Sequence, residues 1–163
     1  MNQEDADAQE VMEFADASCL PWLAASTVTG IIPQDPGEFV RMHTILVVDD
    51  EPLIRWAVRE GLESAGFQVL EAGSAREALA ELGGAAAGVD VALLDIRLPD
   101  SDDLGLLKRM RSDAPSCRVI MMTAHGTPEL LAEAIRAGAF ATLSKPFDMS
   151  GMIDVVRAAG AAA

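Results

Sequence analysis

Acidic side chains follow two apolar segments of this sequence at the point where each segment ends. Asp49 and Asp50 come directly after the apolar segment 44–48, and Asp95 closes the segment 89–95. Apolar segments of this length are typical of strands that are buried on both faces of a parallel sheet. Ligands bind such sheets just beyond the carboxyl ends of the strands. We therefore expect the three carboxylates to lie close together.

Two further polar residues belong to the same edge, because Thr123 ends the segment 118–123 and Lys145 directly follows 141–144. Three neighbouring carboxylates repel one another and raise each other's pKa, and a hard dication such as Mg²⁺ relieves that repulsion. Asp95 is a candidate nucleophile, since carboxylates form acyl phosphates with a suitable donor. Lys145 and the metal would neutralise charge on the transferred phosphoryl oxygens, and the Thr123 hydroxyl would hydrogen-bond to them.

Each of these residues taken alone has a simpler explanation. A strand-end aspartate caps a loop or helix more often than it binds metal, and a lysine before a proline is usually solvated. The occurrence of suitable residues at four successive strand ends favours a metal-assisted phosphoacceptor site over these explanations.

The elements that must position these side chains alternate between strand and helix five times. The expected strands are 44–48, 68–72, 89–95, 118–123 and 141–144. The first expected helix begins at Pro52, and the four later helices are expected at 74–82, 104–112, 127–138 and 150–159. Helix starts are indicated by Pro52 at a first helical position, by Ser74 with Glu77 in a capping-box pattern, and by Thr127 before a proline. The inner face predicted for the first helix comprises Ile54, Val58, Gly61, Leu62 and Ala65.

The polarity of the strands predicts their order in the sheet. Segments 44–48, 89–95 and 118–123 are almost wholly apolar, which is typical of central strands. Segments 68–72 and 141–144 carry polar side chains and are expected at the edges. With right-handed crossovers, the sequence predicts an α/β, flavodoxin-like (βα)5 fold whose central parallel five-stranded sheet has the order 2-1-3-4-5. The switch point of that sheet lies between the first and third strands.

Charge divides the chain of 163 residues into two parts. Residues 1–41 hold eight acids and one base, and residues 42–163 hold 18 acids and 11 bases. The first part lacks clean periodicity, apart from a weak helical pattern over 3–17. We expect 1–41 to be an acidic, disordered N-terminal extension and 42–163 to be the folded domain. Met42 leaves open a second interpretation, in which the domain starts there and the upstream residues are a misassigned extension.

Composition excludes several classes of function. A net charge of −14 argues against direct binding of nucleic acid, because phosphate contacts need a basic face. The acidic N-terminus does not resemble a signal peptide, and no apolar stretch predicts a membrane span. Cys19 and Cys117 are far apart and lack metal-binding spacing, so we expect reduced thiols. A cytoplasmic location is the expectation.

Four motifs, taken in order, resemble the receiver domain of response regulators in two-component signalling. They are ILVVDDEP at 45–52, LLDIRLP at 93–99, MMTAH at 121–125 and KPF at 145–147. The resemblance covers about 44–159, and residues 122–125 and 138–140 are most similar to receivers of the nitrogen-regulation class.

The resemblance implies a function for each acid at the sheet edge. Asp95 would be the phosphoacceptor, Asp50 would bind Mg²⁺ (or Mn²⁺) directly, and Asp49 would assist through water. The backbone carbonyl of Arg97 would be a further metal ligand. The phosphodonor would be a sensor histidine kinase or a histidine phosphotransfer protein.

The resemblance also assigns the residues that contact the phosphoryl group. Thr123 and Lys145 would bind its oxygens, and the peptide bond between Lys145 and Pro146 would be cis, which only an X–Pro bond adopts at low cost. Phosphorylation would change the surface formed by the last two helices and the fifth strand, and thereby the binding of an unidentified protein target. The chain stops at Ala163, so it is expected to be either a stand-alone receiver or part of a longer regulator.

Two positions depart from the pattern of the family. Thr142 stands where an aromatic switch residue is usual, so the coupling between Thr123 and the output surface is expected to be weaker or different. Asp103 replaces a usual glycine, and with Asp100 and Asp102 it makes the loop after the phosphoacceptor unusually acidic. These departures leave open a receiver-like interaction module that is not phosphorylated.

A second alternative is a Mg²⁺-dependent phosphohydrolase of the haloacid-dehalogenase type, which also uses an aspartate nucleophile. That class needs a second aspartate two residues after the nucleophile, and this chain has Arg97 there. We therefore do not expect turnover of an external substrate. The nearby His125 is a further candidate for a catalytic base, although a solvated loop histidine is the simpler interpretation.

Two apolar residues of the first helix fall outside its inner face. Leu53 and Trp56 are therefore expected to form part of the surface on which a histidine phosphodonor docks, because large exposed apolar groups suggest contact with a partner. Partial burial of these two side chains against the last helix is the competing explanation.

Overall fold

The computed structural model describes residues 42–84, 88–101 and 104–162. The predictions for the extension 1–41, including Cys19, and for Asp102 and Asp103 lie outside this part of the chain. The elements, in chain order, are β1 (Thr44–Val48), α1 (Pro52–Ser64), β2 (Gln68–Ala72), α2 (Ala75–Gly84), β3 (Val91–Asp95), α3 (Gly105–Asp113), β4 (Arg118–Thr123), α4 (Pro128–Arg136), β5 (Ala141–Ser144) and α5 (Met149–Ala161).

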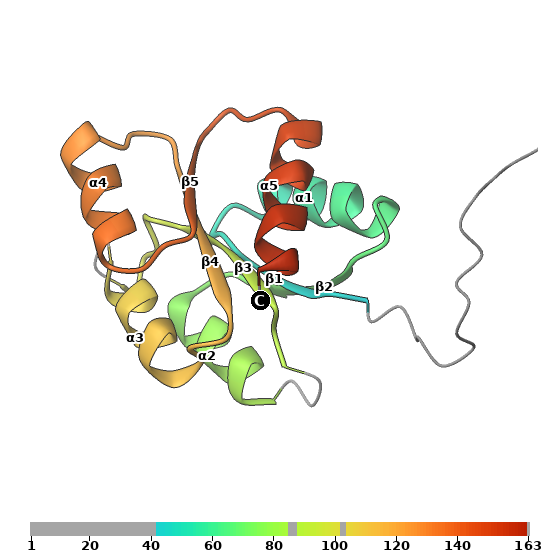
Figure 1. The fold of residues 1–163 in the computed structure, drawn as a ribbon, viewed down its shortest axis with the longest axis horizontal. Helices are drawn as coiled ribbons and strands as arrows, with labels where there is room; N and C mark the ends of the chain where they lie inside the picture. Colours follow the sequence, from blue (N-terminus) through green and yellow to red (C-terminus); the bar gives the residue numbers. More distant parts are fainter. Residues whose placement is uncertain (1–41, 85–87, 102–103, 163) are drawn as a thin grey trace, which may run out of the picture. The chain divides into compact units, whose positions relative to one another are not determined.

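The five strands form one sheet of order β2-β1-β3-β4-β5, as Figure 1 shows. Every neighbouring pair is parallel. All residues of β1 and β3 are buried, whereas β2 and β5 are largely half-exposed. The predicted flavodoxin-like topology is confirmed, and its physical basis is confirmed with it, because the wholly apolar strands are central and the mixed strands lie at the edges.

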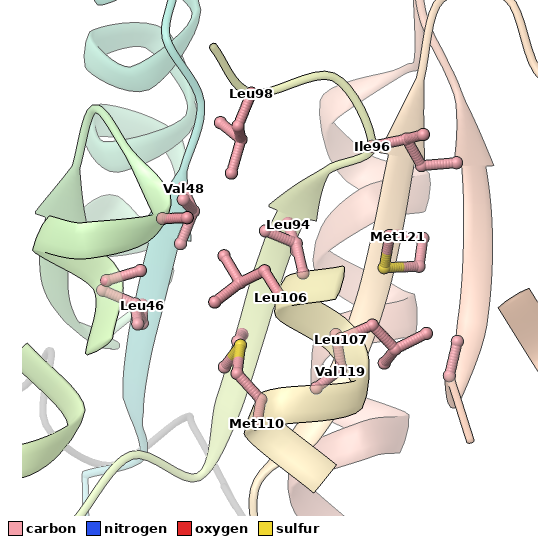
Figure 2. Close-up of a cluster of buried hydrophobic side chains, with 14 of the residues drawn as sticks. Leu46, Val48, Leu94, Ile96, Leu98, Leu106, Leu107, Met110, Val119 and Met121 are labelled. Carbon is pink, nitrogen blue, oxygen red and sulfur yellow. The ribbon is translucent and has the colours of Figure 1, made fainter. Parts of the chain in front are cut away.

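Successive side chains of the central strands point to opposite faces of the sheet, and each face has its own helices. On the first face, Leu46, Leu94 and Met121 pack with residues of α2, α3 and α4. Figure 2 shows this cluster, in which Leu107 and Met110 of α3 lie over the strands. The sheet therefore has a fully covered first face, as its continuous apolar strands require.

The second face is covered by α1 and α5. Val58 and Leu62 of α1 pack on the alternate strand residues, together with Met152 and Val156 of α5. The two helices also meet each other at Gly61, where an added Cβ would lie 2.5 Å from the sulfur of Met149. The predicted inner face of α1 is thus confirmed, and Gly61 belongs to it because the α5 end approaches so closely.

Local capping explains where the helices begin. The Thr127 hydroxyl accepts a hydrogen bond from the backbone N–H of Leu130 at 3.3 Å, directly before Pro128. At α2 the Ser74 hydroxyl accepts from the N–H of Glu77 at 3.2 Å. The Glu77 carboxylate accepts from the N–H of Gly73, one residue earlier than in the usual capping box.

Several element boundaries, among them those of α2, α4 and α5, differ by one or two residues from the sequence-based expectation. β3 begins at Val91 instead of residue 89, and the carboxylate of Asp90, directly before it, accepts a hydrogen bond from the N–H of Thr44 at 2.9 Å. α5 begins at Met149, since the Asp148 carboxylate caps it by accepting from the N–H of Gly151. None of the helices in the described ranges is long and apolar enough to cross a membrane.

Candidate functional site

Three aspartates meet at the carboxyl edge of the sheet, as predicted. β1 and β3 are neighbours with Val48 opposite Leu94, so the residues that follow them lie side by side. Asp49, Asp50 and Asp95 each offer a carboxylate oxygen, and these oxygens all lie within 4.8 Å of one another. Asp49 is 0% exposed and Asp95 is 8% exposed, whereas Asp50 is exposed to solvent.

Lys145 lies between the two buried acids. Its Nζ atom is 2.5 Å from Oδ2 of Asp49 and also donates a hydrogen bond to Oδ2 of Asp95. The lysine side chain is 9% exposed, so the interpretation of Lys145 as a solvated residue is wrong. Its backbone N–H donates to the carbonyl of Thr123 at 2.7 Å, and the bond to Pro146 is cis, as expected. Residues 96 positions apart in the chain thus share one ion pair.

The charges of this cluster are unbalanced. Burial raises the pKa of the Asp49 carboxyl above its usual value, although hydrogen bonds from Lys145 and from the N–H of Glu51 act in the opposite direction. Burial alone would lower the pKa of Lys145, but its hydrogen bonds to Asp49 and Asp95 outweigh burial and raise it. One ammonium contacts two of the three neighbouring carboxylates, so the lysine stays protonated while the cluster keeps an excess of negative charge.

Each polar atom of Asp49 has a hydrogen-bond partner. Its N–H donates to the carbonyl of Ala72 at 3.1 Å, and its Oδ1 accepts from the N–H of Glu51 at 2.9 Å. Its own carbonyl accepts from Nη1 of Arg55 at 2.6 Å, and its Oδ2 faces Lys145. Arg55 was not among the residues singled out from the sequence, because a helix-surface arginine carries no local sign of such a contact.

Arg97 follows Asp95 by two residues, just beyond the end of β3. Its backbone N–H donates to Oδ1 of Asp95 at 2.9 Å, and its residue is exposed. The two carboxylate oxygens of Asp95 therefore have different partners, Arg97 on one side and Lys145 on the other. This arrangement holds the carboxylate in one orientation at the end of β3.

Thr123 ends β4 beside this cluster. It is 2% exposed, and it is one position beyond Met122, which lies opposite Asp95 in the sheet. Its hydroxyl oxygen accepts from the N–H of His125 at 3.1 Å, whereas the His125 residue itself is exposed. At Gly126 an added Cβ would lie 2.7 Å from the Thr123 methyl group, so this glycine permits the tight turn.

In the acidic loop after β3, Asp100 binds backbone N–H groups of α2 and not the phosphoacceptor site. The Asp100 carboxylate accepts from the backbone N–H groups of Ala75 and Arg76, at 2.8 and 3.0 Å. These bonds lower the pKa of Asp100, and they direct its charge to the amino end of α2. Thr142, at the position of the usual aromatic switch residue, is half-buried in β5 opposite Met121.

The two apolar residues outside the inner face of α1 are exposed, Leu53 by 81% and Trp56 by 55%. A groove of about 480 Å³ runs from this part of α1 to the end of β5. Its lining residues come from α1 and the residue before it, the β4–α4 loop, the β5–α5 connection and the start of α5: Glu51, Leu53, Ile54, Ala57, Val58, Ala124, Lys145, Pro146, Phe147 and Met149.

A five-stranded (βα)5 domain with three aspartates and a lysine at its carboxyl edge has clear relatives. Residues 45–157 match the family model described as the response regulator receiver domain. This match covers more than half of the chain, so the chain belongs to the response regulator receiver family.

Two relatives show how much of this chain and of each relative the match covers. The transcriptional regulator NtrC of Salmonella typhimurium is 39% identical over 115 residues, which are 71% of this chain and 24% of NtrC. Sporulation initiation phosphotransferase F of Bacillus subtilis is 34% identical over 113 residues, which are 69% of this chain and 90% of that protein. The chain thus spans about a quarter of NtrC, and its resemblance to the nitrogen-regulation class is confirmed.

Solved structures agree with this assignment. A receiver domain protein from Clostridium thermocellum has a TM-score of 0.70 and 29% identity, with 74% of this chain and 96% of that chain covered. NtrX from Brucella abortus has a TM-score of 0.69 and 35% identity, with 74% of this chain and 27% of that chain covered.

Proposed function

We propose that this chain is a phosphorylation-dependent switch of a two-component system, in which Asp95 accepts a phosphoryl group from a phosphohistidine. The phosphodonor is a sensor histidine kinase or a histidine phosphotransfer protein. The observation that carries the proposal is the buried Lys145 held between Asp49 and Asp95, with Asp50 alongside. A purely structural aspartate needs hydrogen bonds alone, whereas this cluster has more negative charge than its single ammonium neutralises.

The donor set fits a small divalent cation. Three carboxylate oxygens within 4.8 Å suit a hard ion, and the exposed Asp50 leaves room for the water ligands that Mg²⁺ retains. Asp50, Asp95 and the backbone carbonyl of Arg97 would hold Mg²⁺ or Mn²⁺, and Asp49 would assist through water. The bound ion supplies positive charge that stabilises the phosphoryl oxygens during transfer.

The side chains of the site divide the transfer reaction between them. A carboxylate oxygen of Asp95 forms a bond to phosphorus, the P–N bond to the donor histidine breaks, and its electron pair returns to the imidazole nitrogen. The ammonium of Lys145 already contacts Asp95, so it is placed to neutralise charge that moves onto the phosphoryl group. The Thr123 hydroxyl donates a hydrogen bond to a phosphoryl oxygen. No external substrate is turned over.

The change on phosphorylation passes through Thr123 to the surface of α4, β5 and α5, where a protein target binds. This surface carries exposed apolar side chains, since Ile135 is 48% and Phe140 is 39% exposed. Thr142 brings a small hydroxyl side chain to β5 in place of an aromatic ring, so the switch cannot depend on the burial of a ring there. The protein acts in the cytoplasm and does not itself contact nucleic acid.

The phosphodonor docks on α1 beside the groove. Leu53 and Trp56 supply exposed apolar surface, and the groove wall includes Lys145, which connects this surface with the phosphoacceptor site. The substitution Trp56→Ala should slow transfer from the cognate kinase and leave phosphorylation by acetyl phosphate intact. Equal effects on both donors would refute docking at this position.

Incubation with acetyl phosphate and Mg²⁺, followed by intact-mass measurement, tests the proposed function. We expect one added phosphoryl group on the native chain, none on Asp95→Asn, and one on Asp90→Asn. Asp90 is a matched control because it is also buried but lies just before the start of β3, whereas Asp95 is at its end. Absence of an adduct would support the silent interaction module, and release of phosphate over many turnovers would support the phosphohydrolase.

A further inference from the structure

The carbonyl oxygen of Asp49 has a side-chain partner from α1, which the proposed function does not use. Asp49 is fully buried, and the hydrogen bond from Nη1 of Arg55 to its carbonyl oxygen is 2.6 Å long. A buried carbonyl that loses its partner is costly, so the contact stabilises the turn between β1 and α1. This turn carries both Asp49 and Asp50.

Arg55 is itself held by its surroundings. Its Nε atom lies 3.7 Å from Oε1 of Glu71 in β2, and its backbone N–H donates to the carbonyl of Glu51 at 3.1 Å. The guanidinium passes close to Gly73, where an added Cβ would lie 3.3 Å from Nη1. One arginine therefore ties α1, β2 and the β1–α1 turn together.

We infer that Arg55 is a positioning residue that orients the Asp49–Asp50 pair for a divalent cation by fixing the carbonyl of Asp49. The peptide unit that joins the two aspartates is planar, so the direction of this carbonyl sets the plane from which the backbone of Asp50 continues. The inference rests on the proposed function, because it concerns the same metal site.

The positive charge of Arg55 does not explain why this side chain lies next to the proposed metal site. A cation near a metal site repels the metal, but the Glu71 carboxylate compensates this one. The second oxygen of Glu71 accepts from Nη1 of Arg59 at 2.8 Å. Arg59 lies on the same helix and pairs with the same glutamate, and its other ion pairs are with Glu60 and Glu63. It is therefore a matched control.

A titration of the full chain with Mn²⁺ tests the inference without any phosphodonor. The electron paramagnetic resonance signal of the free ion measures how much Mn²⁺ is bound. We expect Arg55→Lys to weaken Mn²⁺ binding by about 10-fold, the lower end of the range for partners that orient metal ligands. A lysine lacks the planar fork that reaches Glu71 and Asp49 together. Arg59→Lys should bind Mn²⁺ like the native chain.

Thermal melting in EDTA separates positioning from general damage, because Arg55→Lys and Arg59→Lys should melt at similar temperatures. Where Arg55→Lys does not fold, Glu71→Gln serves as the second variant, and it should weaken Mn²⁺ binding without removing Arg55. Unchanged or tighter binding in Arg55→Lys, or equal weakening in Arg59→Lys, overturns the inference alone. Absence of binding to the native chain, or full binding to Asp50→Asn, overturns the proposed metal site as well.

Discussion

Aspartates are buried at both ends of the parallel sheet, but their carboxylates have different partners at the two ends. At the amino end, the carboxylate of Asp90 accepts from the N–H of Thr44 at 2.9 Å, and this bond joins the starts of two strands. At the carboxyl end, Asp49 and Asp95 share the ammonium of Lys145 and lie beside a third acid.

The difference shows that burial of a charge does not by itself identify a functional site. What separates the two ends is the number of carboxylates relative to the donors that face them. A single acid that accepts from a backbone N–H and has the His43 imidazole beside it stabilises the fold, whereas three acids with one ammonium leave negative charge that a ligand can neutralise. The following changes test this comparison at each end of the sheet.

The largest effect is expected for Gly126→Ala at the carboxyl end. The added Cβ would lie 2.7 Å from the methyl group of Thr123 and 2.8 Å from a methyl group of Leu131. Overpacking at both contacts should cost about 3 kcal/mol in the free energy of unfolding and slow phosphorylation by acetyl phosphate, because Thr123 is displaced. Urea unfolding measures the first effect. Gly83→Ala, where the added Cβ meets nothing within 4 Å, should not destabilise the chain.

At the amino end, Asp90→Ala should destabilise the fold by about 2 kcal/mol, because the buried N–H of Thr44 loses its acceptor. The loss should be the same with and without Mg²⁺ in urea unfolding, since this carboxylate has a structural function. A stability loss that depends on Mg²⁺ would contradict the division of the two ends.

Asp50→Asn should have effects of opposite sign with and without metal. In EDTA the variant should melt at a higher temperature than the native chain, because it removes one of three mutually repelling carboxylates. In Mg²⁺ the native chain should gain stability by binding the ion, and the variant should gain little. Thermal melting in both buffers is the measurement, and a variant that gains as much from Mg²⁺ as the native chain would refute the metal site.

Asp100 tests whether an acid near the carboxyl end acts structurally when donors suffice. Its pKa is lowered by the N–H groups of Ala75 and Arg76, so it stabilises the fold above about pH 4, and this contribution is lost as the pH falls through its folded pKa. The stability difference between the native chain and Asp100→Asn should therefore shrink on acidification below pH 4. A difference that is constant with pH in urea unfolding would contradict this.

The smallest effect is expected at Cys117, just before β4 at the amino end. Burial raises the pKa of this free thiol to about 11, so at pH 8 about one molecule in a thousand carries the reactive thiolate. In a Cys19→Ser background, a disulfide reagent should label Cys117 slowly in the native state and rapidly after unfolding. Rapid labelling of the native chain would show that this end opens readily.

Much of the fold followed from hydropathy along the chain. Uninterrupted apolar strands such as β1 and β3 must lie in the middle of a parallel sheet, and mixed strands such as β2 can be tolerated only at its edges. The meeting of Asp49, Asp50 and Asp95 follows from that order, because strand ends converge at one edge. The start of β3 was missed because the apolar Val89 and Val91 concealed the structural use of Asp90 between them.

The sequence by itself determined the strand order and the residue types at the carboxyl edge, because both depend on local polarity and on chain connectivity. Only the tertiary structure decided which partner each side chain takes. Lys145 bridges two acids, Arg55 holds the carbonyl of Asp49, and Asp100 turns to the start of α2. These choices are made by donors and acceptors that are distant in the chain, and they depend on which groups the packed elements bring within hydrogen-bonding distance.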